Sequence, residues 1–297
     1  MVKGRRSSWI AAAFAVAALF ACKKGPAPLA TVSVVRLSPA GITQHPWLGL
    51  GPAELEERGR QALQSTGAIA VRREGSPEQT SDWKAMLEIT HVRTVPSETG
   101  EAGTRAEVGV LWTLQRGGER VRGDAVGHHA FVPHDPRMRA EAFRHALDLA
   151  LEDAARLVAL QLGAARKSDE ELIADLEHED PAVRDLAIRV LTERKSTAAV
   201  RYLIERLDDE DRNVQLRAIG ALVEIGDPSA VPALVDATSQ RDASFVAQVA
   251  YALGEFGDEN AEAFLFTAST GHPEPAVRRA AAEALENLRK RRQEARR

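Results

Sequence analysis

Apolar residues recur every three or four positions through the C-terminal part of the chain. In one stretch Val214, Leu222 and Ile225 belong to a single apolar stripe, and this spacing predicts an amphipathic helix. Matching places in successive units, 31, 31 and 32 residues apart, are held by Val183, Val214, Phe245 and Val277. A unit of this length that recurs along a chain predicts a solenoid of stacked helix pairs.

Capping residues stand where the predicted helices begin and end. Asp180 and Asp211 precede the apolar stripes, where a carboxylate accepts free amides of the first turn. Pro181 suits the first helical position, and Gly226 and Gly257 follow the stripes, where a left-handed residue is favoured. We therefore expect each unit to contain two helices.

The segments 214–227 and 245–258 resemble the short HEAT-like repeats of the phycobilisome-lyase type. Four such units span residues 169–290. The first unit departs from the pattern, because Lys195-Ser196 replaces the Gly-Asp turn, and the fourth lacks this turn as well. Terminal units are commonly atypical because they cap the stack. The resemblance implies a curved surface for another protein and supplies no reaction.

In HEAT architecture the Val-rich helices line the concave side, so their outward positions are candidate partner-binding residues. These positions are Asp185, Arg189, Leu216, Val223, Glu224, Tyr251, Glu255, Arg279 and Glu283. Leu216 and Val223 lie one heptad apart, with Tyr251 in the next unit. Either packing between the units covers these apolar residues, or they form an apolar contact patch for a partner.

The N-terminal half has a different pattern. Apolar runs and period-two alternation predict strands at Thr31–Leu37, Ala68–Arg72, Trp83–Val95, Val108–Leu114 and Arg120–Val132. Gly117-Gly118 predicts a hairpin between the last two. Helical spacing predicts helices over 51–65 and 137–165. The fold class we expect is an α/β domain in the order β-α-β-β-β-α, with one sheet and two helices, followed by an all-α HEAT-like solenoid.

This order of elements resembles a domain of bacterial envelope lipoproteins, and the segments 62–72 and 142–162 carry the likeness. Its relatives are the N-terminal domain of the Tol-system propeller protein, the curli-secretion lipoprotein and the lipoprotein activators of penicillin-binding proteins. The resemblance implies that the domain binds partner proteins or assembles into envelope complexes, without enzymatic activity.

The first residues have the pattern of an export signal. A basic start is followed by an apolar run over residues 9–21, which is shorter than the roughly 20 residues of a spanning helix. The run ends in Leu19-Phe20-Ala21-Cys22, which resembles the bacterial lipobox, and Cys22 is the single cysteine. The resemblance implies acylation of Cys22. The alternative is an ordinary secretory signal followed by a chance cysteine.

These observations predict a protein attached to a membrane by lipid, with unidentified envelope proteins as partners. Lys23 follows the cysteine, which favours the outer membrane, facing the periplasm. We expect a signal peptide at residues 1–21, a lipidated tether at 22–35, an α/β domain at 36–166, the repeats at 169–290 and a basic tail at 291–297.

Charge argues against nucleic acid as a partner. The formal net charge is −4, and removal of residues 1–21 takes away three basic residues, which leaves 36 − 43 = −7. The basic tail suits the negative end of a helix dipole, and anionic lipid or an acidic partner is the alternative.

Catalytic motifs are absent from the sequence. The chain has no Gly-x-Ser-x-Gly elbow, no phosphate loop and no His-Glu-x-x-His pair. We therefore expect no enzymatic activity and no cofactor. The alternative is a metal-dependent or lyase-type enzyme that uses His128, His129 and His134. Adjacent histidines on a strand point to opposite faces, so only one of the first two could join His134.

Overall fold

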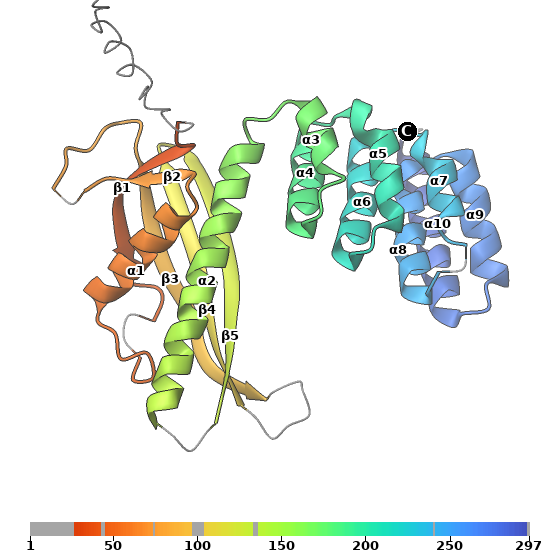
Figure 1. Ribbon diagram of the computed structural model, residues 1–297. Helices are drawn as coiled ribbons and strands as arrows, with labels where there is room; N and C mark the ends of the chain where they lie inside the picture. The colour runs from red at the N-terminus through yellow and green to blue at the C-terminus, as the bar shows by residue number, and fades with distance from the viewer. Residues whose placement is uncertain are drawn as a thin grey trace, which may run out of the picture.

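The computed structural model describes residues 27–42, 45–73, 75–96, 104–132, 136–239 and 241–295. Cys22, the signal segment and His134 therefore lie outside the described residues. A sheet with two helices is followed by a row of helices that runs away from it (Figure 1). In the described part of the chain, no helix combines the length and the apolar character needed to cross a membrane.

The sheet has five strands in the order β2-β1-β3-β4-β5. They are β1 (Ala30–Leu37), β2 (Ile69–Val71), β3 (Trp83–Pro96), β4 (Thr104–Arg116) and β5 (Glu119–Phe131). β1 pairs in parallel with β2 and β3, and β3, β4 and β5 form an antiparallel meander. The α/β class is confirmed. The expected order β-α-β-β-β-α has one strand too few, because all five segments with a strand pattern form strands.

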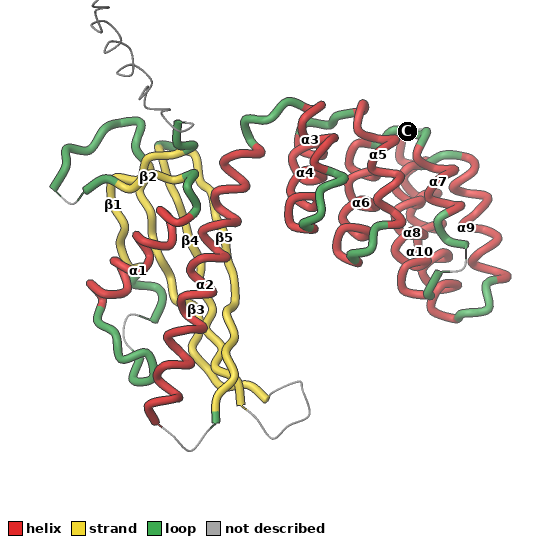
Figure 2. The backbone as a smooth tube through the Cα atoms, viewed as in Figure 1, coloured by secondary structure: helices red, strands yellow, loops and turns green. Residues whose placement is uncertain are grey.

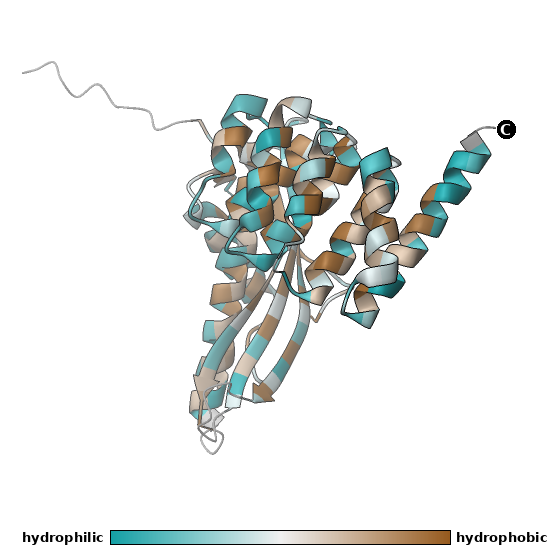
Figure 3. Ribbon diagram, turned by 90° about the vertical axis from the view of Figure 1, so that its right-hand side faces the viewer, coloured by the Kyte–Doolittle hydropathy of each residue, from teal (hydrophilic) through white to brown (hydrophobic). Residues whose placement is uncertain are grey.

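Helices α1 (Pro52–Ser65) and α2 (Pro136–Ala164) cover one face of this sheet (Figure 1). Strand β3 shows the consequence, since Trp83, Ala85 and Leu87 are buried and Lys84 and Met86 are exposed. The alternating bands along the strands in Figure 3 reflect the same division into a covered and an open face.

Glycines on β5 allow α2 to approach the sheet closely. A Cβ atom at Gly127 would lie 1.9 Å from the carbonyl oxygen of Ala146, and one at Gly123 would lie 2.5 Å from that of Ala154. Both carbonyls belong to α2. Only glycine permits this contact, which holds the long helix against the edge strand.

The remaining helices form a stack of two layers (Figure 2). One layer contains α4 (Pro181–Glu193), α6 (Arg212–Ile225), α8 (Ala243–Phe256) and α10 (Pro275–Ala295). The other contains α3 (Asp169–Asp175), α5 (Val200–Glu205), α7 (Ala230–Asp236) and α9 (Glu259–Gly271). Short 3-10 turns, Thr197–Ala199 and Arg206–Asp208, flank α5. One continuous apolar core runs through the stack, as stacking of incomplete units requires.

The predicted caps form. Asp180 accepts from the amide of Ala182, and Asp211 accepts from the amides of Asn213 and Val214. Gly226 and Gly257 end their helices with φ of 76° and 70°. The atypical first unit keeps the same backbone, because Lys195, 31 residues before Gly226, also adopts a left-handed φ of 53°. The sequence of this turn differs from the repeat pattern, whereas its conformation does not.

Candidate interaction surfaces

The nine predicted partner-binding residues all lie in the layer of α4, α6, α8 and α10. Glu224, Glu255, Arg279 and Glu283 are exposed, as are Leu216 and Tyr251, at 37% and 43% of their surface. Asp185, Arg189 and Val223 are partly covered. The structure therefore places the predicted set on one side of the stack. Their role in binding stays a prediction.

Several of the polar members connect neighbouring units. Arg217 of α6 donates to Asp185 of α4 at 2.7 Å, and the hydroxyl of Tyr251 in α8 donates to Glu283 of α10 at 2.9 Å. Because this hydrogen bond stabilises the neutral phenol beside a carboxylate, the pKa of Tyr251 is raised. These side chains contribute to stacking as well as to the outer surface.

Two further members have ion-pair partners in other parts of the stack. The ammonium of Lys195 lies 3.3 Å from the carboxylate of Glu224, and Arg291 pairs with Glu255. Exposed pairs of this kind contribute little stability, up to about 1 kcal/mol each. Their side chains can therefore exchange partners at low cost when another protein approaches.

The apolar members line a shallow groove between α6, α8 and α10, which we call the repeat groove. Its volume is about 280 Å³. Leu216, Val223 and Tyr251 lie along it together with Ile219 and Gly220 of α6. Packing between the units leaves Leu216 and Tyr251 exposed, so the geometry favours the contact patch over the alternative of complete coverage.

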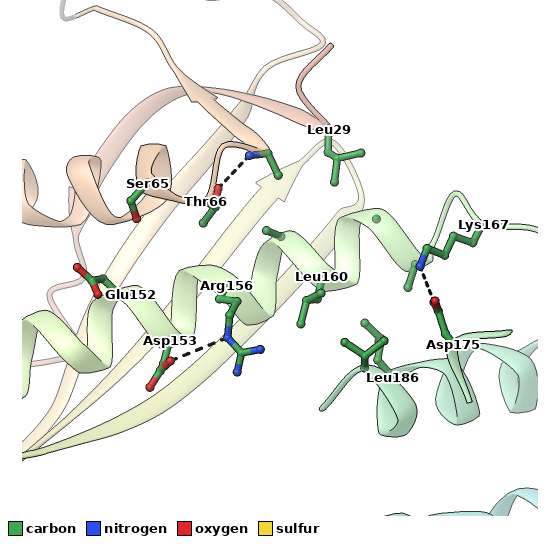
Figure 4. A pocket seen from close by; sticks show the side chains of 15 residues that line it. Leu29, Ser65, Thr66, Glu152, Asp153, Arg156, Leu160, Lys167, Asp175 and Leu186 are labelled. Atoms are coloured by element: carbon green, nitrogen blue, oxygen red, sulfur yellow. Dashed lines mark hydrogen bonds and ion pairs between the residues drawn. The ribbon is translucent and has the colours of Figure 1, made fainter. Parts of the chain in front are cut away.

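A larger groove, of about 570 Å³, lies where the α/β domain meets the first repeat (Figure 4). We call it the junction groove. Its apolar lining is Leu29, Ala68, Ala159, Leu160, Ala164, Val183 and Leu186. The sequence analysis missed this site because its residues come from four separate segments. The one available signal was the apolar stripe of α2, which continues as far as Leu160 and Ala164.

Ion pairs cross this junction. Arg156 of α2 lies 2.5 Å from Asp180, and Lys167 lies 2.5 Å from Asp175 of α3. Burial acts to raise the pKa of Asp180, but the amide of Ala182 and the guanidinium of Arg156 together lower it below its ordinary value. Leu160 packs against the solenoid core, and Ala164 is buried within it. Helix α2 is thus shared by both cores.

The two described histidines of the predicted cluster, His128 and His129, lie on opposite faces of the sheet. His128 lies on the open face of the sheet, where its Nδ1 is 3.6 Å from Glu107. His129 lies on the other face, with its ring centroid 4.4 Å from that of His145 in α2. The two adjacent side chains therefore point apart, as expected. Within the described ranges, no three His, Cys, Asp or Glu side chains group as metal ligands would.

Glu107 is the centre of a polar cluster that the sequence analysis did not single out. Its carboxylate is 2.5 Å from the Nε of Arg93 and 3.0 Å from the Nε2 of His91, and its side chain is only 8% exposed. Burial acts to raise the pKa of Glu107, but the hydrogen bond and charge of Arg93, with His128 and His91, lower it below its ordinary value. The carboxylate of Glu107 therefore joins basic side chains of β3 and β5 on the open face of the sheet.

The basic residues near the C-terminus have partners in the preceding helices. Arg292 donates to the carbonyl of Gly257 at 2.6 Å, and Arg291 donates to that of Gly254. Arg289 lies 3.0 Å from Glu262 in α9. Cationic groups at carbonyls that end a helix are favourable. The carbonyls of Gly254 and Gly257 lie at the end of α8, so Arg291 and Arg292 stabilise the packing of α10 against α8.

Comparison with known proteins supports the repeat assignment. A family model described as HEAT repeats matches residues 170–251, which run from the start of α3 into α8. This segment of the chain therefore carries HEAT repeats. No curated protein matches the chain.

Three solved structures with partial similarity each cover less than half of the chain. A phycocyanin lyase complex, CpcE and CpcF from Nostoc sp. PCC7120, is 23% identical over 41% of this chain, with a TM-score of 0.32. The match covers 65% of that lyase chain, so this protein spans slightly less than two thirds of its length.

Two further similar structures are described as a putative lipoprotein and a minor lipoprotein of bacteria. A putative lipoprotein from Caulobacter crescentus CB15 is 19% identical over 46% of this chain and 93% of its own, with a TM-score of 0.30. A minor lipoprotein from Acinetobacter baumannii is 10% identical, over 46% of this chain and 94% of its own, with a TM-score of 0.28. The resemblance to HEAT-like repeats expected from the sequence agrees with the family-model match over residues 170–251.

Proposed function

We propose that this protein is a lipid-anchored protein of the bacterial cell envelope that binds other proteins through its HEAT repeats and performs no catalysis. The observation that carries the proposal is the repeat groove. It places the exposed side chains of Leu216 and Tyr251 along one apolar depression between successive units. Apolar patches of this kind on a repeat protein are typical protein-binding surfaces.

Gly220 supports the same surface. It lies in the interior of α6, where glycine costs about 1 kcal/mol of helix stability relative to alanine. Among the described residues, apart from its chain neighbours and its own helix backbone, no heavy atom lies within 4 Å of the place that its Cβ would occupy, so packing against them does not require glycine here. Gly254 of α8 differs, because its Cβ would lie 2.9 Å from that of Ala284. A partner backbone that approaches the groove at Gly220 would account for the missing side chain.

Full-length protein produced in its own bacterium tests the scaffold role. Proteins that copurify with it are compared with those that copurify with Leu216→Lys and Tyr251→Lys. The matched control is Val126→Lys, which alters an exposed apolar residue on the open face of the sheet. We expect both groove variants to lose a shared partner at least about tenfold, since a desolvated charge in an apolar contact costs more than 1.4 kcal/mol. Equal recovery with all three variants would contradict the proposal.

The proposed anchor rests on the lipobox resemblance at Cys22. The wild-type protein and Cys22→Ala are labelled with a radioactive fatty acid and fractionated into membrane and soluble parts. We expect label and membrane association only with the cysteine, because several acyl chains, at about 0.8 kcal/mol per buried methylene, hold a protein firmly. Unlabelled wild-type protein in the soluble fraction would refute this part. Fractionation of inner from outer membrane then tests the proposed outer-membrane location, facing the periplasm.

A further inference from the structure

Three helices of one layer carry a glutamate at the same position near their C-terminal end. Glu193, Glu224 and Glu255 recur at intervals of 31 residues and lie in the last turn of α4, α6 and α8. Each precedes by two positions the left-handed residue of the turn that follows. All three side chains are exposed. We call this set the glutamate row.

The position of the glutamate row is unfavourable for helix stability. The C-terminal end of a helix carries partial negative charge, so basic residues are preferred there and carboxylates are disfavoured. None of the helices α4, α6 and α8 has a basic residue in its last turn. Because the glutamates are exposed, packing does not require them either. Stability of the stack therefore does not account for the row.

Basic side chains of the same chain show how the row binds a cation. Nζ of Lys195 lies 2.5 Å from the carbonyl oxygen of Glu224 and 3.3 Å from its carboxylate. Arg291 donates to the carbonyl of Gly254 and to the carboxylate of Glu255. Both cations thus bind a glutamate side chain together with a carbonyl at the end of a helix.

The cation-binding positions of the row are accessible to another protein. The paired side chains of Lys195 and Glu224, and of Arg291 and Glu255, are all at least 43% exposed. Exposed ion pairs contribute little stability, so they can be exchanged. Within the part of the chain that the structure describes, no basic side chain pairs with Glu193. A cation from a partner can therefore bind at any of the three glutamates.

The glutamate row borders the repeat groove. Glu255 itself lines the groove, and Glu224 directly follows Val223, which also lines it. The helices that carry the row lie next to one another in one layer (Figure 2). Leu216 and Tyr251 expose apolar surface in the same groove. The groove therefore combines an apolar lining with an acidic border along the helix ends.

We propose that the repeat groove binds a basic amphipathic segment of a partner protein. Its apolar side chains contact Leu216 and Tyr251, and its lysine or arginine side chains bind the glutamate row. This inference rests on the proposed function, in which the groove is the protein-binding surface. Charge complementarity selects the partner, because an acidic segment would be repelled by the row. Packed helices lie about 8–10 Å apart, so the cations recur at about that distance along the segment.

Photo-crosslinking of the full-length protein in its own cells tests the chemistry of the partner. The photoreactive residue p-benzoylphenylalanine replaces Gln248, an exposed residue that lines the groove. The crosslinked segment is identified by mass spectrometry. We expect it to contain at least two lysine or arginine residues among apolar ones. Changing all three glutamates of the row to glutamine should lower the yield about tenfold, since three charge pairs are lost together.

A matched control neutralises three exposed glutamates of the other layer, which should leave the yield unchanged. Its changes are Glu170→Gln, Glu205→Gln and Glu259→Gln, in α3, α5 and α9. The melting temperature of the row variant should equal or exceed that of the wild type, because carboxylates are removed from the negative ends of helices. A melting temperature well below the wild-type value would show that the row acts in folding, against the proposal.

The outcomes separate this inference from the proposed function. Leu216→Lys should abolish the crosslink if the groove is the protein-binding surface. A crosslinked segment without basic residues, or a yield that the row variant does not change, would overturn the basic partner and leave the groove as a binding surface. A crosslink that is insensitive to Leu216→Lys, or no crosslink from Gln248, would contradict the proposed function and this inference with it.

Discussion

Arg156 of α2 and Asp180, the residue that caps α4, lie 2.5 Å apart across the junction between the two parts of the molecule. The same Asp180 carboxylate accepts the amide of Ala182 in the first turn of α4 at 2.9 Å. One side chain therefore begins a helix of the first repeat and also connects that repeat to the α/β domain. The orientation of the solenoid depends on this shared contact and on the apolar residues of α2.

The two roles of Asp180 predict different costs for the two partners. Asp180→Ala removes a helix cap and should lower the free energy of unfolding by about 1 kcal/mol. Arg156→Ala removes only a partly exposed ion pair and should cost about 0.5 kcal/mol or less. Urea denaturation of both variants checks the order. A larger loss for Arg156→Ala than for Asp180→Ala would show that the cap is not the main contribution.

The left-handed turn at Lys195 predicts that glycine is preferred there. A non-glycine residue in this conformation costs roughly 1–2 kcal/mol, and Lys195 has a φ of 53°. Lys195→Gly should raise the free energy of unfolding by about 1 kcal/mol, less a few tenths for the lost ion pair with Glu224. Lys195→Ala is the matched control, since it removes the ion pair and keeps the strain. In thermal melts, the melting temperature of Lys195→Gly should lie above that of the wild type. That of Lys195→Ala should equal the wild-type value or lie below it.

Two glycines in equivalent helices should respond in opposite ways to alanine. Gly220→Ala adds a methyl group in open space and should stabilise the protein by up to about 1 kcal/mol through helix propensity. Gly254→Ala brings two Cβ atoms to 2.9 Å and should destabilise it, by about 1–3 kcal/mol for overpacking. Chemical denaturation measures both. If Gly220→Ala also weakens partner capture, the repeat groove is a close-contact surface, whereas unchanged capture would argue against contact at that point.

Glu107 predicts a loss of stability in acid. Because its pKa lies below the ordinary value in the folded protein, its contribution is fully present above the unfolded pKa and is lost as pH falls through the folded pKa. Glu107→Gln should therefore be less stable than wild type at neutral pH, and the difference should shrink below about pH 4. Unfolding midpoints across this range provide the measurement.

Glu119→Gln is the control for this experiment, because it alters an exposed ion pair with Arg116. Its difference from the wild type should stay small at every pH. A Glu107→Gln difference that is constant with pH would mean that the carboxylate contributes only through its shape.

The sequence alone was sufficient for the helix pairs of the repeat. The apolar stripe that begins at Val214, the cap at Asp211 and the left-handed Gly226 act within a few residues of chain, so each pattern can be read directly. The same holds for the alternation of β3 and β4 and for the helix–strand order, apart from one miscounted strand. The surface positions of Leu216 and Tyr251 followed from the period, because a residue's place in one unit defines its place in the next.

Only the tertiary structure decided which of these positions have partners. No local pattern shows that Lys195 adopts the conformation of a glycine or that Glu107 lies between Arg93 and His91. Nor does it show that a Cβ at Gly254 would meet Ala284, whereas one at Gly220 would meet no other described side chain. The junction groove joins segments that are more than one hundred residues apart. Such relationships depend on how distant elements pack against each other. Packing is determined by the shape and charge of both contacting surfaces, and a single segment of the sequence specifies only one of them.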